Sequence, residues 1–167
     1  MTRLFNVGDK VVYPMYGAGI IEAIEEKEIL GEKKCYYVMR MPIGDMKVMV
    51  PIQSVDEIGL RQVVDEEVIN QVIGRLKLES TDQSTNWNRR YRANMDKMKS
   101  GDIYEIADVV RNLMLREREK GLSTGERKML ENAKTIFISE LALAKDLTEE
   151  EAIALLDNII YEKNASI

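Results

Sequence analysis

Histidine is absent from the 167 residues of this protein, and cysteine occurs once, as Cys35. The common zinc sites need several His or Cys ligands, and the Ser–His and Cys–His catalytic pairs need a histidine, so these sites are excluded. A lone cysteine also excludes an internal disulfide framework and suits a reducing compartment. We therefore expect a cytoplasmic protein without a metal site.

Long apolar runs and nucleotide-binding motifs are missing as well. No stretch approaches the roughly 20 apolar residues that span a bilayer, and the N-terminus lacks a secretory signal pattern. Neither the P-loop pattern nor GxGxxG occurs. The 29 Asp and Glu residues are spread over surface-like positions, so an enzyme that uses carboxylate pairs is the weakest hypothesis. We expect no membrane contact, no cofactor and no enzymatic activity.

Proline is confined to the first 64 residues, where Pro14, Pro42 and Pro51 stand at the ends of short segments. These segments are rich in β-branched and aromatic residues and are separated by glycine-containing turns. Five strands are predicted, over 10–14, 18–26, 35–41, 46–51 and 60–64. Their short, even spacing predicts a small, strongly bent antiparallel sheet or barrel.

After residue 64 the apolar residues recur with the period of a helix. Four apolar stripes run over 69–76, 103–114, 129–144 and 152–160. A further helix is expected from about Thr85 to Lys99. The chain is therefore predicted to be an α+β protein, with a five-stranded domain over 1–64 and a compact helical bundle over 65–167.

Capping residues mark the expected ends of these helices. Ser123 with Glu126, and Thr148 with Glu151, have the spacing of capping boxes at two helix starts. Gly121 is placed to end the helix that begins near residue 102.

Charge is unevenly distributed in the helical half. Residues 65–167 carry 16 basic and 20 acidic groups, a net of −4. Within them, residues 86–99 have a net of +4, from Arg89, Arg90, Arg92, Lys97 and Lys99 against Asp96. The rest of residues 65–167 therefore has a net charge of −8, because −4 minus +4 is −8. A local basic field of this kind suits a polyanion.

The single tryptophan, Trp87, lies beside this basic segment, and two interpretations of it are open. A lone Trp on an amphipathic helix is most often a core residue. However, Asn86 and Asn88 bracket it, and no Glu lies within a helical turn of Arg89 or Arg90. The sequence leaves a buried and an exposed Trp87 equally open.

The chain resembles the CarD/CdnL family of bacterial transcription regulators over nearly its whole length. The N-terminal likeness rests on FNVGDKVVYPMYGAGIIEAIEEKEILGEKKCYYV, MKVMVP and GLR. That module is related to the polymerase-interacting domain of transcription-repair coupling factor. The helical likeness rests on TNWNRRYRANMDKMKSGD, VVRNL and GLSTGERKML.

The resemblance implies that the N-terminal module is Tudor-like and docks on a lobe of the RNA polymerase β subunit, partly by edge-to-edge strand pairing. The segment MKVMVP ends in proline, which suits an edge strand. The family's polymerase-facing positions map onto Lys27, Ile29 and Met49. Some members carry a basic residue in place of Met49, and Lys47 on the same face is expected to supply that charge.

The resemblance also implies that the helical domain contacts promoter DNA at the upstream edge of the transcription bubble, without sequence-specific reading. Trp87 is the expected wedge at the minor groove. The residues expected to bind phosphate are Arg89, Arg90, Arg92 and Lys97, with Arg127 and Lys128 at a second helix start.

These observations lead to one main hypothesis and one alternative. The main hypothesis is a monomeric regulator, associated with the nucleoid through polymerase, that stabilises the promoter open complex. The alternative is a protein-only adaptor in which Trp87 is a core residue or an interface hot spot. Salt-dependent association with DNA distinguishes the two.

Overall fold

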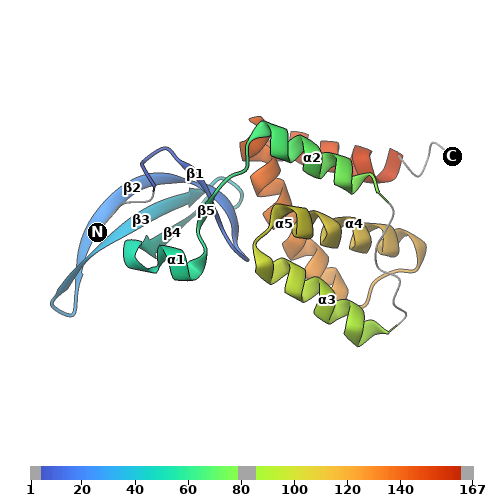
Figure 1. Ribbon diagram of the computed structural model, residues 1–167, viewed down its shortest axis with the longest axis horizontal. Helices are drawn as coiled ribbons and strands as arrows, with labels where there is room; N and C mark the ends of the chain where they lie inside the picture. Colours follow the sequence, from blue (N-terminus) through green and yellow to red (C-terminus); the bar gives the residue numbers. More distant parts are fainter. Residues whose placement is uncertain (1–4, 79–85, 163–167) are drawn as a thin grey trace.

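The computed structural model describes residues 5–78 and 86–162 of the protein (Figure 1). An antiparallel sheet, here called the sheet part, is formed by residues 5–64 and lies beside a group of helices, the helical part, formed by the remaining described residues. Each part has its own cluster of buried apolar side chains. This arrangement confirms the expected α+β fold class.

The sheet part contains five antiparallel strands in the order β4-β3-β2-β1-β5. The strands are β1 (Lys10–Tyr13), β2 (Gly17–Ile29), β3 (Glu32–Met41), β4 (Met46–Pro51) and β5 (Arg61–Gln62). All five were predicted, although the β2–β3 hairpin extends three residues further at its tip than the sequence indicated. The hairpin reaches away from the helices (Figure 1).

Short helical turns connect the edge strand β4 to β5. They are η1 (Ile52–Ser54) and α1 (Val55–Ile58). The helices of the helical part are α2 (Glu66–Leu76), α3 (Trp87–Ser100), α4 (Ile103–Glu119), α5 (Thr124–Lys145) and α6 (Glu149–Asp157). A π-helical turn, η2 (Asn158–Glu162), follows α6. The expected helix start at Thr85 lies outside the described residues.

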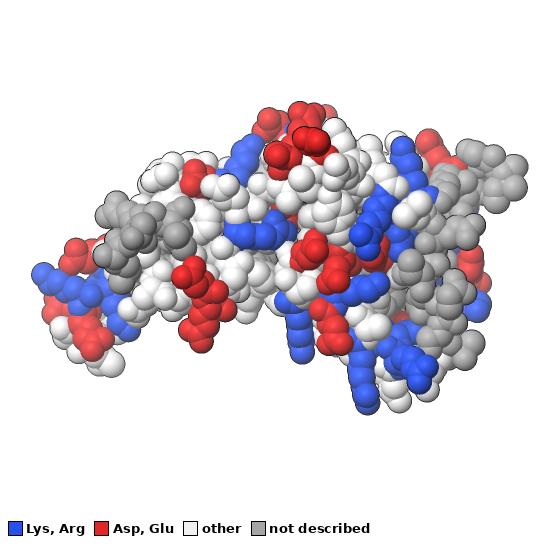
Figure 2. Space-filling model, viewed as in Figure 1, with Lys and Arg blue, Asp and Glu red and all other residues white. Residues whose placement is uncertain are grey.

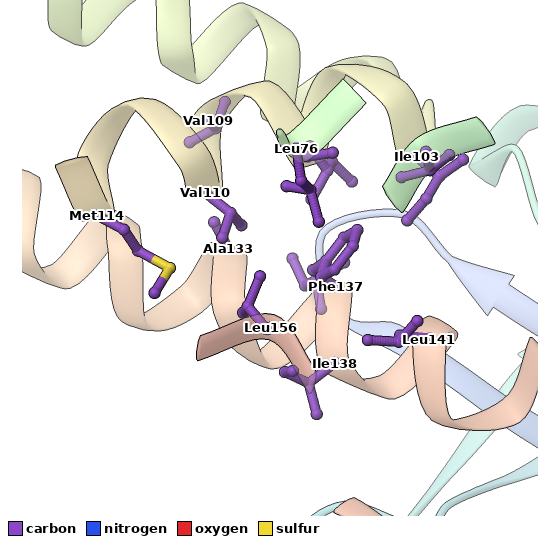
Figure 3. Close-up of a cluster of buried hydrophobic side chains, with 14 of the residues drawn as sticks. Leu76, Ile103, Val109, Val110, Met114, Ala133, Phe137, Ile138, Leu141 and Leu156 are labelled. Carbon is purple, nitrogen blue, oxygen red and sulfur yellow. The ribbon is translucent and has the colours of Figure 1, made fainter. Parts of the chain in front are cut away.

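The helical core forms where the predicted apolar stripes converge (Figure 3). Phe137 of α5 is fully buried, and Leu76 of α2, Val110 of α4 and Leu156 of α6 are buried in the same cluster. The stripes were correct except at their margins, where Ile73, Ala144 and Leu155 are only partly buried. This packing fixes α5 at the centre of the helical part.

The expected caps are present, with one difference. Thr148 and Glu151 form both hydrogen bonds of a capping box. Ser123 accepts a hydrogen bond from the Glu126 backbone N–H, as expected, but the Glu126 carboxylate turns inward instead of completing a box. Gly121 follows the end of α4 at a φ of 80°, a conformation that glycine adopts without strain.

Across residues 5–78 and 86–162, none of the helices combines the length and the apolar character that crossing a membrane requires.

Candidate nucleic-acid and protein interfaces

Trp87 is the first residue of α3, and its side chain lies at the surface of the helical part. Asn86 caps the helix by accepting a hydrogen bond from the Arg89 backbone N–H at 3.1 Å. Trp87 is 40% exposed, so it is neither a core residue nor a free side chain. The structure thus resolves the two interpretations in favour of an accessible ring with one supported face.

Two helices support the indole of Trp87. Its ring stacks on Tyr91, one turn along α3, with centroids 5.0 Å apart and planes 18° apart. Its Nε1–H donates to the Ser123 hydroxyl at 2.8 Å, at the start of α5. A Cβ added at Gly125 would lie 3.4 Å from the ring, so the backbone of α5 passes directly beneath it. These contacts hold the ring in one orientation.

The same contacts bring the starts of α3 and α5 together. Arg89 and Arg92 of α3 and Arg127 and Lys128 of α5 are all exposed. We call these four residues, with Trp87, the basic face. Figure 2 shows Lys and Arg side chains projecting from the lower edge of the helical part, where Figure 1 places α3. The two segments that the sequence predicted as separate anchors therefore begin next to each other.

A groove of about 360 Å³ lies at the start of α3 and is lined by Asn86, Asn88, Arg89 and Arg92. Guanidinium groups bind phosphate oxygens, and side-chain amides offer both donors and acceptors to a sugar or a base edge. The groove is chemically suited to a nucleic-acid backbone.

Arg90 is not part of this surface, contrary to the sequence-based expectation. It is 4% exposed, and its Nε lies 3.4 Å from the Glu126 carboxylate, which is 2% exposed. The 3.6-residue period turns Arg90 inward when Arg89 and Arg92 point outward. Arg90 cannot reach phosphate from this position, and it instead ties α3 to α5 beneath Trp87.

Lys97 is also less available than expected, because its Nζ lies 3.8 Å from the buried carboxylate of Asp108. Arg75 donates two hydrogen bonds to the same carboxylate, and Arg111 lies 3.2 Å from it. The bond to Asp108 raises the pKa of Arg75, whereas burial lowers the pKa of Arg111. Arginine stays charged at neutral pH in either case. The positive charge of Lys97 is thus partly neutralised by Asp108 and is less available to a phosphate group.

Three residues at this site were missed by the sequence analysis in their present roles. Tyr91 supports the ring of Trp87, Ser123 binds its N–H, and Glu126 pairs with Arg90. The four-residue spacing of Trp87 and Tyr91 was a readable signal, because such residues are neighbours on a helix. The other two contacts join residues 36 positions apart and leave no local pattern.

The sheet part offers a second surface at the edge strand β4, which pairs only with β3 within the described residues. Lys27, Ile29, Lys47 and Met49 were expected to face polymerase. Each is exposed, and each lies opposite an even-numbered residue of β3. Paired residues of antiparallel strands point to the same side, so all four share one face of the sheet.

These four residues form two groups on that face. Lys27 and Ile29 lie near the hairpin tip, whereas Lys47 and Met49 lie on β4. The β3 partners of the two groups are at least four residues apart, or about 13 Å along the strand, as for Lys27 and Met49. For Ile29 and Lys47 they are eight residues apart, or about 27 Å. The Lys47 Nζ lies 3.5 Å from Glu22 and remains largely exposed. The face therefore presents basic and apolar groups beside an open strand edge.

Comparison with protein families gives two matches that together cover most of the chain. Residues 5–64 match the model described as "CarD-like/TRCF RID domain", and residues 71–157 match "CarD, C-terminal domain". The first match covers the sheet part and the second covers α3, α4, α5 and α6.

A relative that aligns over most of the chain agrees with these matches. The "Putative transcription factor YdeB" of Bacillus subtilis (strain 168) is 46% identical over 148 residues, which are 89% of this chain and 97% of that protein. A solution NMR structure of the 72-residue N-terminal domain of Myxococcus xanthus CarD is 39% identical. It covers 37% of this chain and 83% of its own, with a TM-score of 0.32.

Proposed function

The chain belongs to the CarD family and is a transcription regulator linked to RNA polymerase; from this premise we propose that it stabilises the promoter open complex. In this proposal the sheet part binds the polymerase β subunit while the basic face contacts DNA at the upstream edge of the bubble. The observation that carries it is Trp87, an oriented and accessible aromatic ring on a helix that also exposes Arg89 and Arg92. The protein acts as a cytoplasmic monomer and has no enzymatic activity.

Trp87 is proposed to act as the wedge at the DNA junction. An aromatic ring stacks on a base without reading its sequence, which is worth roughly 1–3 kcal/mol per base. The support from Tyr91 and Ser123 means that little side-chain freedom is lost when the ring engages. Arg89, Arg92 and the two cations of α5 would hold the flanking phosphates.

On the polymerase side, β4 is proposed to extend a sheet of the β subunit. An open edge offers main-chain donors and acceptors to another strand, and the neighbouring side chains confer specificity. The face that carries Lys27, Ile29, Lys47 and Met49 would lie against the partner. The separate hydrophobic clusters support the proposal that 1–64 and 65–167 are two domains with these two tasks.

A protein that holds both partners favours the state in which both contacts form at once. Once the sheet part is docked, DNA binding becomes intramolecular and gains a high effective concentration. Only the melted promoter offers the junction that Trp87 fits, so the open complex gains most. Whether transcription rises or falls then depends on the step that limits a given promoter.

The contact with DNA should depend strongly on salt. With four exposed cations at the basic face, log Kd should rise with log salt at a slope of about 3.6, or 0.9 for each phosphate. Replacing Arg92 with glutamine should reduce the slope by about 0.9. Fluorescence titration of duplex DNA at several salt concentrations measures both values.

Lys33→Gln is the matched control, because Lys33 is exposed on the sheet part, away from the basic face. It removes the same charge and should leave the slope unchanged. A slope near zero for the unaltered protein would favour the protein-only adaptor.

The polymerase contact should weaken when its rim charges are reversed. Replacing Lys27 and Lys47 together with glutamate should raise the Kd for the β subunit on the order of tenfold, mainly through slower association, because exposed charges steer encounter. Surface plasmon resonance with the immobilised β lobe gives both rates.

Lys33→Glu provides the comparison for Lys27→Glu alone, since Lys33 is on the same hairpin but faces the opposite side of the sheet. Equal effects of the two single variants would show that only net charge matters, and would remove Lys27 from the interface.

A further inference from the structure

A buried carboxylate links the two parts of the protein. Glu140 of α5 is 1% exposed, and its two oxygens accept hydrogen bonds from both terminal nitrogens of Arg61, each at 2.7 Å. The Val64 backbone N–H donates to the same carboxylate at 3.0 Å. Two planar groups joined by parallel bonds fix their mutual orientation as well as their distance.

Arg61 makes a third connection through its remaining nitrogen. Its Nε–H donates to the Gly101 carbonyl at 2.9 Å. Gly101 is the residue that ends α3, the helix that carries Trp87. A single side chain of the sheet part therefore holds α5 and the end of α3 together.

Neighbouring contacts fix the sheet on α5 at the same place. The Ala18 backbone N–H donates to the Ser139 hydroxyl at 2.8 Å. A Cβ at Gly17 would lie 2.9 Å from that hydroxyl, so only glycine allows this approach. At the rim, the Lys10 Nζ donates to the Leu143 carbonyl at 3.0 Å. The junction combines buried polar contacts with close backbone packing.

Helix α5 connects this junction to the basic face. Its first turn lies beneath Trp87, and Glu140 is 15 residues beyond Gly125, or about 22 Å along the helix axis. In Figure 1, α5 runs from beside α3 to the sheet. Because α5 is also the centre of the helical core, it cannot bend without disturbing that core.

We propose that Arg61 and Glu140 are positioning residues that set the orientation of the polymerase-binding sheet relative to the DNA-binding face. The inference rests on the proposed function, because only a protein that engages two partners at once needs a fixed span. A rigid link places Trp87 at the bubble edge as soon as the sheet docks. A loose link binds each partner equally well but seldom presents both contacts together.

A purely stabilising role of the pair has different consequences. If Arg61 and Glu140 only held the fold, a variant that remains folded would retain full activity. If they set orientation, a folded variant would lose activity while its affinity for each separate partner stayed unchanged. The two roles can therefore be separated by experiment.

Arg61→Lys is the variant that separates them. Lysine keeps the positive charge beside Glu140, which limits the loss of stability, but it cannot form the two parallel bonds together with the bond to Gly101. Arg118→Lys is the matched control, since it makes the same chemical change at a residue that faces Tyr161, away from the junction.

The first measurement uses the single Trp and the single Cys of the chain. Time-resolved energy transfer from Trp87 to an acceptor dye on the partly exposed Cys35 reports the distribution of distances between the two parts. A narrow distribution is expected for the labelled parent and for Arg118→Lys, and a clearly broader one for Arg61→Lys. An unchanged distribution in Arg61→Lys would overturn the inference, whatever the activity.

The second measurement is the open-complex lifetime with holoenzyme and a linear promoter. The factor by which the protein lengthens the open-complex lifetime is expected to be at least fivefold smaller for Arg61→Lys than for the parent. The Kd values of Arg61→Lys for the β lobe and for duplex DNA should stay within twofold of those of the parent. The inference would be overturned if Arg61→Lys had a broader distance distribution and still lengthened the open-complex lifetime as much as the parent does. If the parent itself does not lengthen the lifetime, the proposed function fails, and the distance distribution still decides whether Arg61 fixes the orientation.

Discussion

Replacing Trp87 with alanine should shorten the lifetime of the promoter open complex roughly tenfold at saturating protein. The lost stacking on an exposed base is worth on the order of 1–3 kcal/mol, and this contact exists only when the DNA is melted. Binding to the β subunit should be unchanged, because the surface proposed for that contact lies on the sheet part. Competitor-challenge decay of preformed complexes measures the lifetime.

A thermal melt of the same variant separates the wedge from a structural role. Trp87 is partly exposed but stacks on Tyr91 and bonds Ser123, so its removal should cost about 1–2 kcal/mol of unfolding free energy. Replacing a core tryptophan with alanine would instead lower the free energy of unfolding by about 3–5 kcal/mol. Trp87→Phe keeps a ring and should retain most of the lifetime. A normal lifetime for Trp87→Ala would refute the wedge.

Replacing Glu140 with alanine should lower the free energy of unfolding by about 3 kcal/mol. Removing one partner of a buried ion pair leaves the other with an uncompensated charge, and Arg61 is about one quarter exposed, which places the cost at the low end for such pairs. The Val64 N–H also loses its acceptor. Urea denaturation followed by circular dichroism measures the change.

Glu66→Ala is a suitable control for this loss. Glu66 is an exposed residue whose carboxylate lies 3.8 Å from Lys145, and its removal should change the unfolding free energy by no more than about 0.5 kcal/mol. Equal effects of the two variants would mean that the junction contributes no more than a surface contact.

Much of the fold could be predicted from the sequence because its local signals agree with its packing. The sequence placed Lys47 and Met49 on the same face of β4, and both are exposed, whereas Val50 on the other face is buried. Glycine and capping residues in the sequence correctly predicted most of the helix ends. At these positions the backbone geometry depends on the residue itself and its immediate neighbours, so no distant contact was needed.

The candidate DNA site could be predicted only in part, because burial of a charge depends on a partner elsewhere in the chain. Arg89 and Arg90 are adjacent and chemically identical, yet one is exposed and the other is paired inside with Glu126. The helical period predicts that they point in different directions, but not which of them meets a carboxylate. Lys97 and Asp108 show the same limitation.

The junction between the sheet part and the helical part left no signal in the sequence. Arg61 and Glu140 are 79 positions apart, and each looks like an ordinary surface charge in its own segment. A pair of this kind becomes visible only when β5 and α5 are placed side by side.

The open edge of β4 has a consequence for the free protein as well. A strand that can pair with a partner can equally pair with a second copy of itself, which is a route to aggregation. Lys47 places a charge on this edge, so two copies approaching edge to edge would bring like charges together. Pro51 ends the strand without a donor, which keeps the available edge short. The same residues that shape the proposed docking edge therefore also help to keep the unbound chain dispersed.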